Sequence, residues 1–138
     1  MLVDKFYIRK FLLAGKCYCK IENSKSGNSF DFIIKKSSTQ GSEVYFVQIV
    51  EGNRKSYAGV VYLKGGILCF SKGEKGMCSP YDMEIKALLY VYNNADVLPN
   101  YVHVYHFGKC AVCGRKLTDD DSIERGVGPE CWKKINSF

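Results

Sequence analysis

Cysteine side chains near the C-terminal end of the sequence have the spacing of a metal site. Cys110 and Cys113 form a Cys-x-x-Cys pair followed by Gly114, and Cys131 returns after 17 further residues. Two residues between thiolates let both sulfurs reach one ion from a tight turn, and glycine permits the backbone conformation that this turn requires. The spacing predicts one structural Zn²⁺ ion per chain, with these three cysteines as ligands.

A tetrahedral zinc site has a fourth ligand, and two histidines are candidates for it. His106 lies four residues before Cys110 and is the preferred one, with His103 as the rival. If residues 102–106 form a strand, the two imidazoles point to opposite faces. A distant cysteine is a further alternative, and a fourth position left to water would make the zinc catalytic rather than structural.

The surroundings of the last cysteine predict a helix. Proline suits the first helical position, so Pro129 places Cys131 in the first turn, where the helix dipole favours a thiolate. Seven cysteines fit a disulfide framework poorly. The remaining four are predicted to be core or loop thiols: Cys17, Cys19, Cys69 and Cys78.

The chain before the metal motif has the pattern of a β-rich body. Period-two alternation over residues 16–36 predicts a hairpin, and the apolar run 44–50 predicts a central strand. Residues 57–63 and 67–70 flank two glycines and predict a second hairpin. Residues 102–106 are expected to form a last strand.

One helix is predicted to pack on this sheet. Ser79 can cap it and Pro80 suits its first position. Residues 1–14 fit either a helix that ends at Gly15 or a strand followed by a turn. Residues 119–121, three aspartates, are interpreted as an acidic loop.

These elements predict an α+β fold: an N-terminal antiparallel β-sheet or meander packed by one helix, with a C-terminal, treble-clef-like zinc knuckle. We expect residues 1–100 to form the β-rich domain and residues 101–138 to form a zinc-binding segment packed on it as one unit. No apolar run approaches the roughly 20 residues of a membrane span. Charges in residues 1–10 stand where a signal peptide needs its apolar core, so we expect a cytoplasmic protein.

Known catalytic motifs are absent from the sequence. There is no His-Glu-x-x-His, no phosphate-binding Walker motif and no Gly-x-Ser-x-Gly. The His-x-Glu of zinc deaminases is also missing, and Glu130 instead precedes the last cysteine. We therefore expect a protein that is not an enzyme.

The net charge of +6 permits binding to nucleic acid or to an acidic protein surface. Basic residues around the metal motif are the expected partner or nucleic-acid surface: Lys109, Arg115, Lys116, Arg125, Lys133 and Lys134. The alternative is a solvated basic rim, with the aromatic side chains in the core.

The C-terminal motif resembles a cassette of small, mostly uncharacterised proteins of bacteriophages and other mobile elements. Its pattern is His-x-Gly-basic-Cys-x-x-Cys-Gly-Arg-x-Leu-Thr, then Ser-Ile, then Gly-x-Gly-Pro-x-Cys, and residues 106–131 follow it. Residues 11–16 and 26–30 are similar more loosely. The family has Asp-Pro after the threonine where this chain has Asp119-Asp120. The resemblance implies that His106 is the fourth ligand and that the protein acts in the cytoplasm of a bacterial host.

Small phage-borne proteins of this kind include zinc-containing anti-CRISPRs of Cas9. The resemblance thus implies a non-enzymatic inhibitor that binds a host defence nuclease such as Cas9 and blocks its DNA loading or activity. The alternative is a nucleic-acid-binding zinc module of phage origin.

Overall fold

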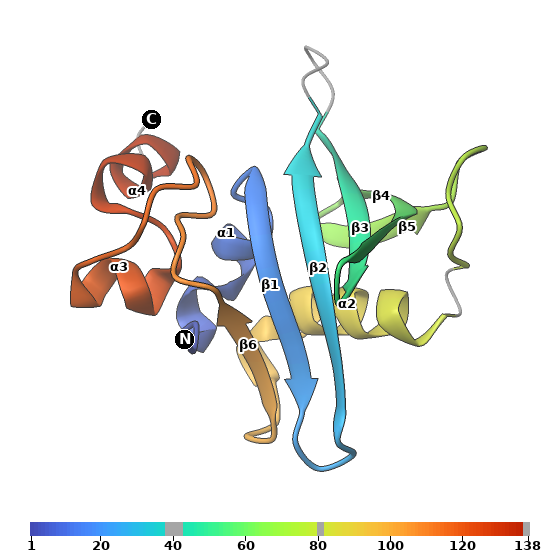
Figure 1. Ribbon diagram of the computed structural model, residues 1–138, viewed down its shortest axis with the longest axis horizontal. Coiled ribbons are helices and arrows are strands. Elements are labelled where there is room, and N and C mark those ends of the chain that lie inside the picture. Colours follow the sequence, from blue (N-terminus) through green and yellow to red (C-terminus); the bar gives the residue numbers. More distant parts are fainter. Residues whose placement is uncertain (38–42, 80–81, 137–138) are drawn as a thin grey trace.

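The computed structural model describes residues 1–37, 43–79 and 82–136. Six strands form one antiparallel sheet in the order β5-β4-β3-β2-β1-β6 (Figure 1). They are β1 (Lys16–Asn23), β2 (Asn28–Lys36), β3 (Val44–Glu51), β4 (Arg54–Lys64), β5 (Ile67–Ser71) and β6 (Val102–His106). The helices are η1 (Lys5–Tyr7), α1 (Ile8–Leu12), α2 (Met83–Asn93), η2 (Ala95–Val97), α3 (Asp120–Arg125) and α4 (Pro129–Ile135). The predicted α+β fold with an antiparallel sheet is confirmed, and its last strand, β6, pairs with β1.

The first hairpin forms where the alternation predicts it. Cys17, Cys19 and Ile21 of β1 are buried, and the residues between them point to the other face of the sheet. Cys17 lies opposite Ile34 and Cys19 opposite Phe32, so the buried side chains of both strands share one face. The two cysteines therefore act as small core residues, as predicted.

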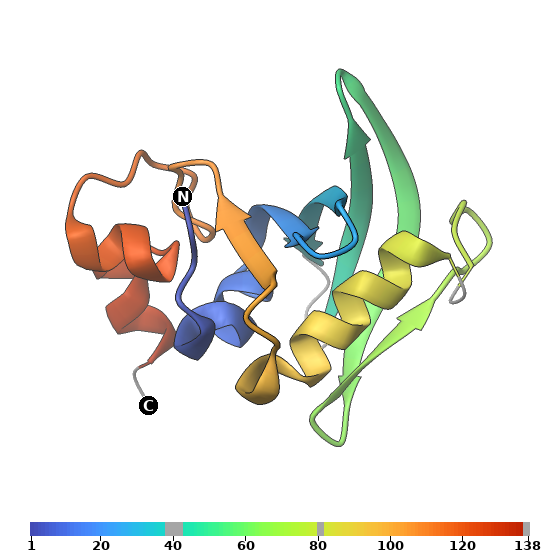
Figure 2. The same ribbon diagram turned by 90° about the horizontal axis from the view of Figure 1, so that it is seen from below.

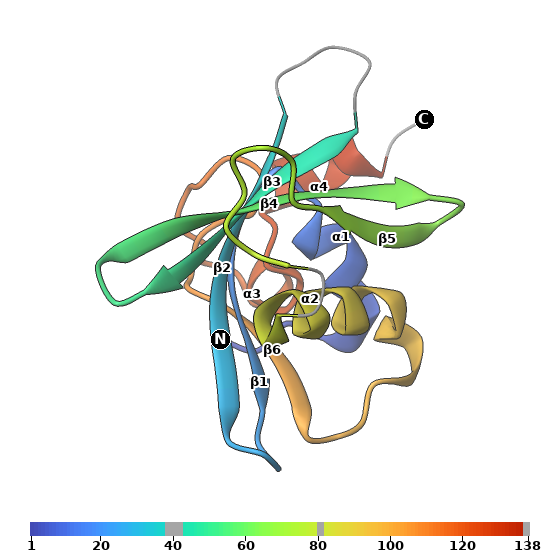
Figure 3. The same ribbon diagram turned by 90° about the vertical axis from the view of Figure 1, so that its right-hand side faces the viewer.

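The sheet is strongly curled, and its strand direction turns markedly between β1 and β5 (Figure 3). A bulge contributes to this turn. Val47 pairs with Gly59 and Gln48 with Tyr57, which leaves Ala58 as the extra residue of β4. Such a bulge increases the local twist of a strand pair.

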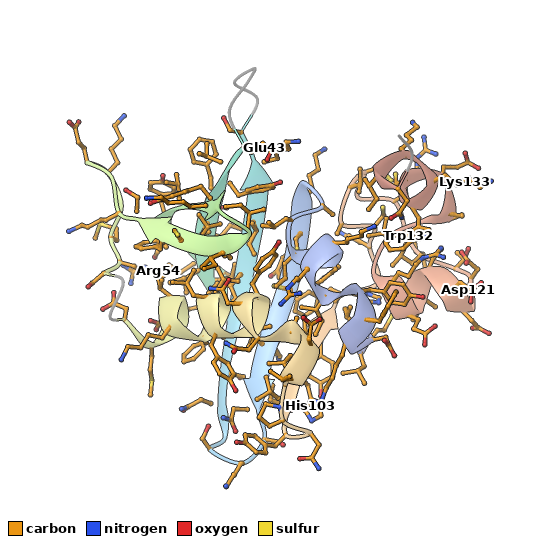
Figure 4. The ribbon with its side chains drawn as sticks, turned by 180° about the vertical axis from the view of Figure 1, so that it is seen from behind. Glu43, Arg54, His103, Asp121, Trp132 and Lys133 are labelled. Atoms are coloured by element: carbon orange, nitrogen blue, oxygen red, sulfur yellow. The ribbon has the colours of Figure 1, made fainter. Side chains whose placement is uncertain are left out.

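Helices α1 and α2 cover one face of the sheet and leave the opposite face of β1 and β2 free of helices (Figures 1 and 4). Helix α2 buries Ile85, Leu88 and Val91 in the core. The side-chain amide of Asn93 fixes its end by accepting from the Leu68 amide and donating to the Leu68 carbonyl, at 2.8 and 3.1 Å. None of the helices in the described segments is long and apolar enough to cross a membrane.

Helix α2 begins later than the sequence suggests. Its first residue is Met83, and Asp82 stands at the N-cap. The Asp82 carboxylate accepts from the Ser79 amide at 2.8 Å, so Ser79 belongs to the turn before the helix. Pro80, which was expected at the first helical position, lies outside the described residues.

The N-terminal segment is helical, and it also contacts the far edge of the sheet. Phe11 and Leu12 of α1 are fully buried. The amide of Val3 donates to the Val104 carbonyl at 2.8 Å, and the amide of His106 donates to the Met1 carbonyl at 2.9 Å. Figure 2 shows this segment alongside β6. The N-terminus therefore covers the edge of β6 just before the metal motif.

Candidate metal centre

The loop after β6 forms a tight turn that presents two thiols. The amide of Cys110 donates to the Arg115 carbonyl at 2.8 Å, and the amide of Gly114 donates back to the Cys110 carbonyl at 2.9 Å. Gly114 has φ +79°, the left-handed conformation that glycine adopts without strain. The Cys110 sulfur also accepts from the amide of Val112 at 3.4 Å. Amide donors to sulfur in this turn favour a thiolate.

The third thiol comes from the first turn of α4. Pro129 occupies the start of this helix, as the sequence predicts, and Gly128 is its N-cap. The Gly128 amide donates to the Cys110 sulfur at 3.3 Å, which ties the helix start to the turn. The sulfurs of Cys110, Cys113 and Cys131 lie within 4.8 Å of one another and could hold a metal ion.

The three thiols have different proton affinities in the absence of a cation. Burial raises the pKa of Cys110, but the amides of Gly128, Cys113 and Val112 together lower it below the usual value. Burial and the neighbouring thiols raise the pKa of Cys131 to about 11. The sequence predicts that the helix start favours a Cys131 thiolate. Here burial and the neighbouring thiols raise the pKa of Cys131 by more than the helix dipole lowers it. A divalent cation would have to displace this proton at neutral pH.

His106 does not join this group, which corrects the predicted fourth ligand. Its Nδ1 accepts from the Gly108 amide at 2.9 Å, and its Nε2–H donates to the Ile123 carbonyl at 2.6 Å. In this neutral tautomer neither nitrogen has a lone pair free for a metal. Burial lowers the pKa of His106, which keeps the ring neutral at pH 7. Through these two hydrogen bonds the imidazole instead connects β6 to the loop that follows it and to α3.

His103 also lies away from the cysteines. It is on the opposite face of β6, 6.0 Å from the ring of Tyr105. In the described part of the chain, the group of mutually close ligand atoms contains three cysteines and no histidine or carboxylate.

The predicted acidic loop is instead the start of a helix. Asp119 is the N-cap of α3, and its carboxylate accepts from the Ser122 amide at 3.1 Å and from the Ser122 hydroxyl at 2.9 Å. These hydrogen bonds lower the pKa of Asp119. Aspartate is a preferred N-cap, and further acidic residues in the first turn complement the helix dipole. The sequence therefore contained the signal for α3.

A cavity of about 230 Å³ opens beside the three thiols. Its other lining residues are Arg115, Lys116, Leu117, Thr118, Asp119, Gly128, Pro129 and Glu130.

The six basic residues predicted as a partner surface come from the loop after β6, from α3 and from α4. Arg125 lies over the Trp132 ring at 5.1 Å and packs between α3 and α4. Lys133 points away from the body on the outer side of α4, while Trp132 faces it (Figure 4). Lys109 and Lys116 are directly opposite each other across the turn, beside Arg115. Lys134 lies on α4.

Alanine variants of the two histidines in β6 distinguish a structural role of His106 from a role as a metal ligand. We expect His106→Ala to cost about 3 kcal/mol in the free energy of unfolding, because it leaves a buried amide and a buried carbonyl unpaired. His103→Ala is the matched control and should cost less than about 1 kcal/mol. Urea unfolding of the zinc-loaded proteins measures both. A folded His106→Ala protein that has lost its zinc at unchanged stability would contradict this assignment.

A family model matches the C-terminal part of the chain. Residues 103–136 match the model of a family described as a family of unknown function (DUF6011). The match spans most of β6, the cysteine turn, α3 and α4. No curated protein matches the chain. No solved structure matches it either.

Proposed function

We propose that the chain is a non-enzymatic zinc-binding protein in which Cys110, Cys113 and Cys131 hold one structural Zn²⁺ ion. The observation that carries the proposal is the approach of three sulfurs to within 4.8 Å from two segments of the chain. Soft thiolate ligands in a tetrahedral arrangement favour zinc among the common cellular metals.

The charge of the ligand set supports a structural role. Three thiolates and one Zn²⁺ ion sum to a net charge of −1, which reduces the tendency of the metal to ionise a bound water. The fourth position would be filled by water or an external group from the neighbouring cavity. Catalytic zinc sites also keep such a position open, but the sequence lacks the His-x-Glu and His-Glu-x-x-His motifs that supply their general acid or base.

Helix α4 is the element that depends most on the metal. It has seven residues and buries none of them, and helices this short are marginal on their own in water. Its contacts to the body include the edge-to-face pair of Trp132 and Tyr7, whose centroids are 5.2 Å apart. Structural zinc sites supply an apparent 10–16 kcal/mol or so at neutral pH. Native mass spectrometry of the purified protein should find one zinc ion per chain, and metal-free folded protein would overturn the proposal.

We propose further that the protein acts by binding another protein, a bacterial defence nuclease such as Cas9. The resemblance of the C-terminal motif to phage-borne proteins supports this, as does the net charge of +6, which suits an acidic surface or a DNA-loading channel. A surface fixed by a metal also loses little conformational entropy on binding.

Gel filtration with purified effector nucleases tests the inhibitor proposal. The zinc-loaded protein should co-elute with its target and reduce DNA cleavage, and Lys133→Glu tests the exposed outer side of α4 in the same assay. If no tested effector co-elutes and cleavage is undiminished, the inhibitor proposal fails, while the zinc site remains testable by metal content.

A further inference from the structure

A second hollow lies on the helix-free face of the sheet, next to the cysteine turn. In Figure 1 the loop after β6 lies beside the start of β1, and the end of β2 lies on the other side of β1. The hollow has a volume of about 600 Å³. It is lined by Lys16, Tyr18, Ile33, Lys35, Phe107, Lys109, Cys110 and Gly114. This lining contains three lysines and no acidic residue.

Each of the three lysines of this hollow lies directly opposite another lysine, which is electrostatically unfavourable. Lys16 of β1 is directly opposite Lys35 of β2, and Lys109 is directly opposite Lys116. Like charges in direct cross-strand positions destabilise a sheet. Within the described residues, the one ion pair is Arg9–Asp96, so none of these four lysines is neutralised by a carboxylate. The two pairs concentrate positive charge at this end of the sheet at some cost in stability.

Aromatic rings lie between these charges. Tyr18 and Phe107 form an edge-to-face pair with centroids 4.6 Å apart, and they remain 39% and 47% exposed. Ile33 is the cross-strand partner of Tyr18 and is buried beneath the pair. Phe46, the cross-strand neighbour of Lys35, is 42% exposed and continues the aromatic face. Exposed rings beside unpaired cations are what stacking on nucleobases requires.

The charge reverses along the same strands. A separate hollow farther along the sheet is lined by Asp31, Glu51 and Glu84, together with Lys20. The hollow next to the cysteines is therefore the more basic of the two, and a polyanion is expected to bind there rather than in the acidic hollow.

We propose that this hollow binds a segment of single-stranded nucleic acid, with phosphates on Lys16, Lys35 and Lys109 and a base stacked on Tyr18 and Phe107. A single strand fits better than a duplex, because only unpaired bases can offer their faces to the rings. This site is separate from the proposed zinc site. Lys16, Tyr18 and Lys35 belong to the first hairpin, so their positions do not depend on a bound metal.

Fluorescence anisotropy with a labelled oligothymidine of about 15 nucleotides tests the proposal on the zinc-loaded protein. The double variant Lys16→Gln with Lys35→Gln should weaken binding about tenfold or more at low salt and reduce the slope of log affinity against log salt by about 1.4, or 0.7 per phosphate contact. Phe107→Ala should weaken binding about tenfold by loss of stacking. Lys55→Gln with Lys64→Gln, two exposed lysines on β4, is the control of equal charge and should bind nearly as the parent does.

Thermal unfolding of the same variants checks that the lysines are not needed for folding. Removing the Lys16–Lys35 repulsion should leave the melting temperature unchanged or raise it. No binding by the parent protein at low salt overturns the proposal, as does an equal loss in the control variant. Stronger binding to duplex DNA than to the single strand also overturns it.

Discussion

We expect Cys113→Ser to abolish the proposed zinc binding and to unfold the C-terminal segment while the sheet remains folded. A hydroxyl is a poor substitute for a thiolate on zinc, and two remaining cysteines cannot hold the ion against solvent. The C-terminal segment would lose a large part of the folding free energy that a structural zinc site supplies, which is roughly 10–16 kcal/mol. Hydrogen exchange should therefore show amide protection lost in α3 and α4 and kept in β1 to β4.

Cys69→Ser is the matched control for this loss. Cys69 is a free thiol on β5, and its one described hydrogen bond goes to the Ile67 carbonyl at 3.6 Å. This variant should keep one zinc ion per chain and full amide protection in α4. Unchanged zinc content in Cys113→Ser would refute the ligand assignment.

Gly126→Ala should destabilise the protein by about 3 kcal/mol or more, the second large effect we expect. Gly126 ends α3 with φ +73°, and a methyl group there would lie 2.4 Å from the ring of Phe11. Phe11 is fully buried, so the ring has no free space to move into. Urea unfolding of the zinc-loaded protein measures the change.

Gly27→Ala separates backbone strain from this clash. Gly27 has φ +82° in the turn of the first hairpin, and a methyl group there would meet no atom within 4 Å. The variant should cost only about 1 kcal/mol, the penalty of a left-handed alanine. If both variants cost the same, packing of α3 on Phe11 would contribute little to the attachment of the C-terminal segment.

Local sequence patterns predicted the parts of the fold that depend on local physics. The alternation of Cys17, Cys19 and Ile21 places one face of β1 in the core because side chains of a strand alternate in direction. The Cys-x-x-Cys spacing and Pro129 predicted the turn and the helix start that bring three sulfurs together. Each of these signals acts over a few residues.

Long-range pairing explains what the sequence analysis missed. A histidine near cysteines suggests a metal ligand, but both ring nitrogens of His106 form hydrogen bonds, one with Gly108 and one with Ile123. The bond to Ile123 depends on where α3 packs, which local sequence does not show. The pairing of the N-terminal segment with β6 joins residues about a hundred positions apart and leaves no periodic pattern.

The basic partner surface was predicted at the metal end of the chain, and the pairing of Lys16 with Lys35 was not predicted. Lys16 and Lys35 become neighbours only through the register of the first hairpin. That register could have been derived from the alternation of buried residues in both strands, so a signal for the pair was present.

Cobalt substitution tests the central claim most directly. Co²⁺ takes tetrahedral thiolate sites and reports on them by absorption, because zinc itself is spectroscopically silent. Addition of one equivalent of Co²⁺ to the metal-free protein should give strong thiolate-to-cobalt charge-transfer bands and the visible bands of a tetrahedral ion, all displaced by one equivalent of Zn²⁺. Spectra of octahedral Co²⁺ without charge transfer would contradict a site built from Cys110, Cys113 and Cys131.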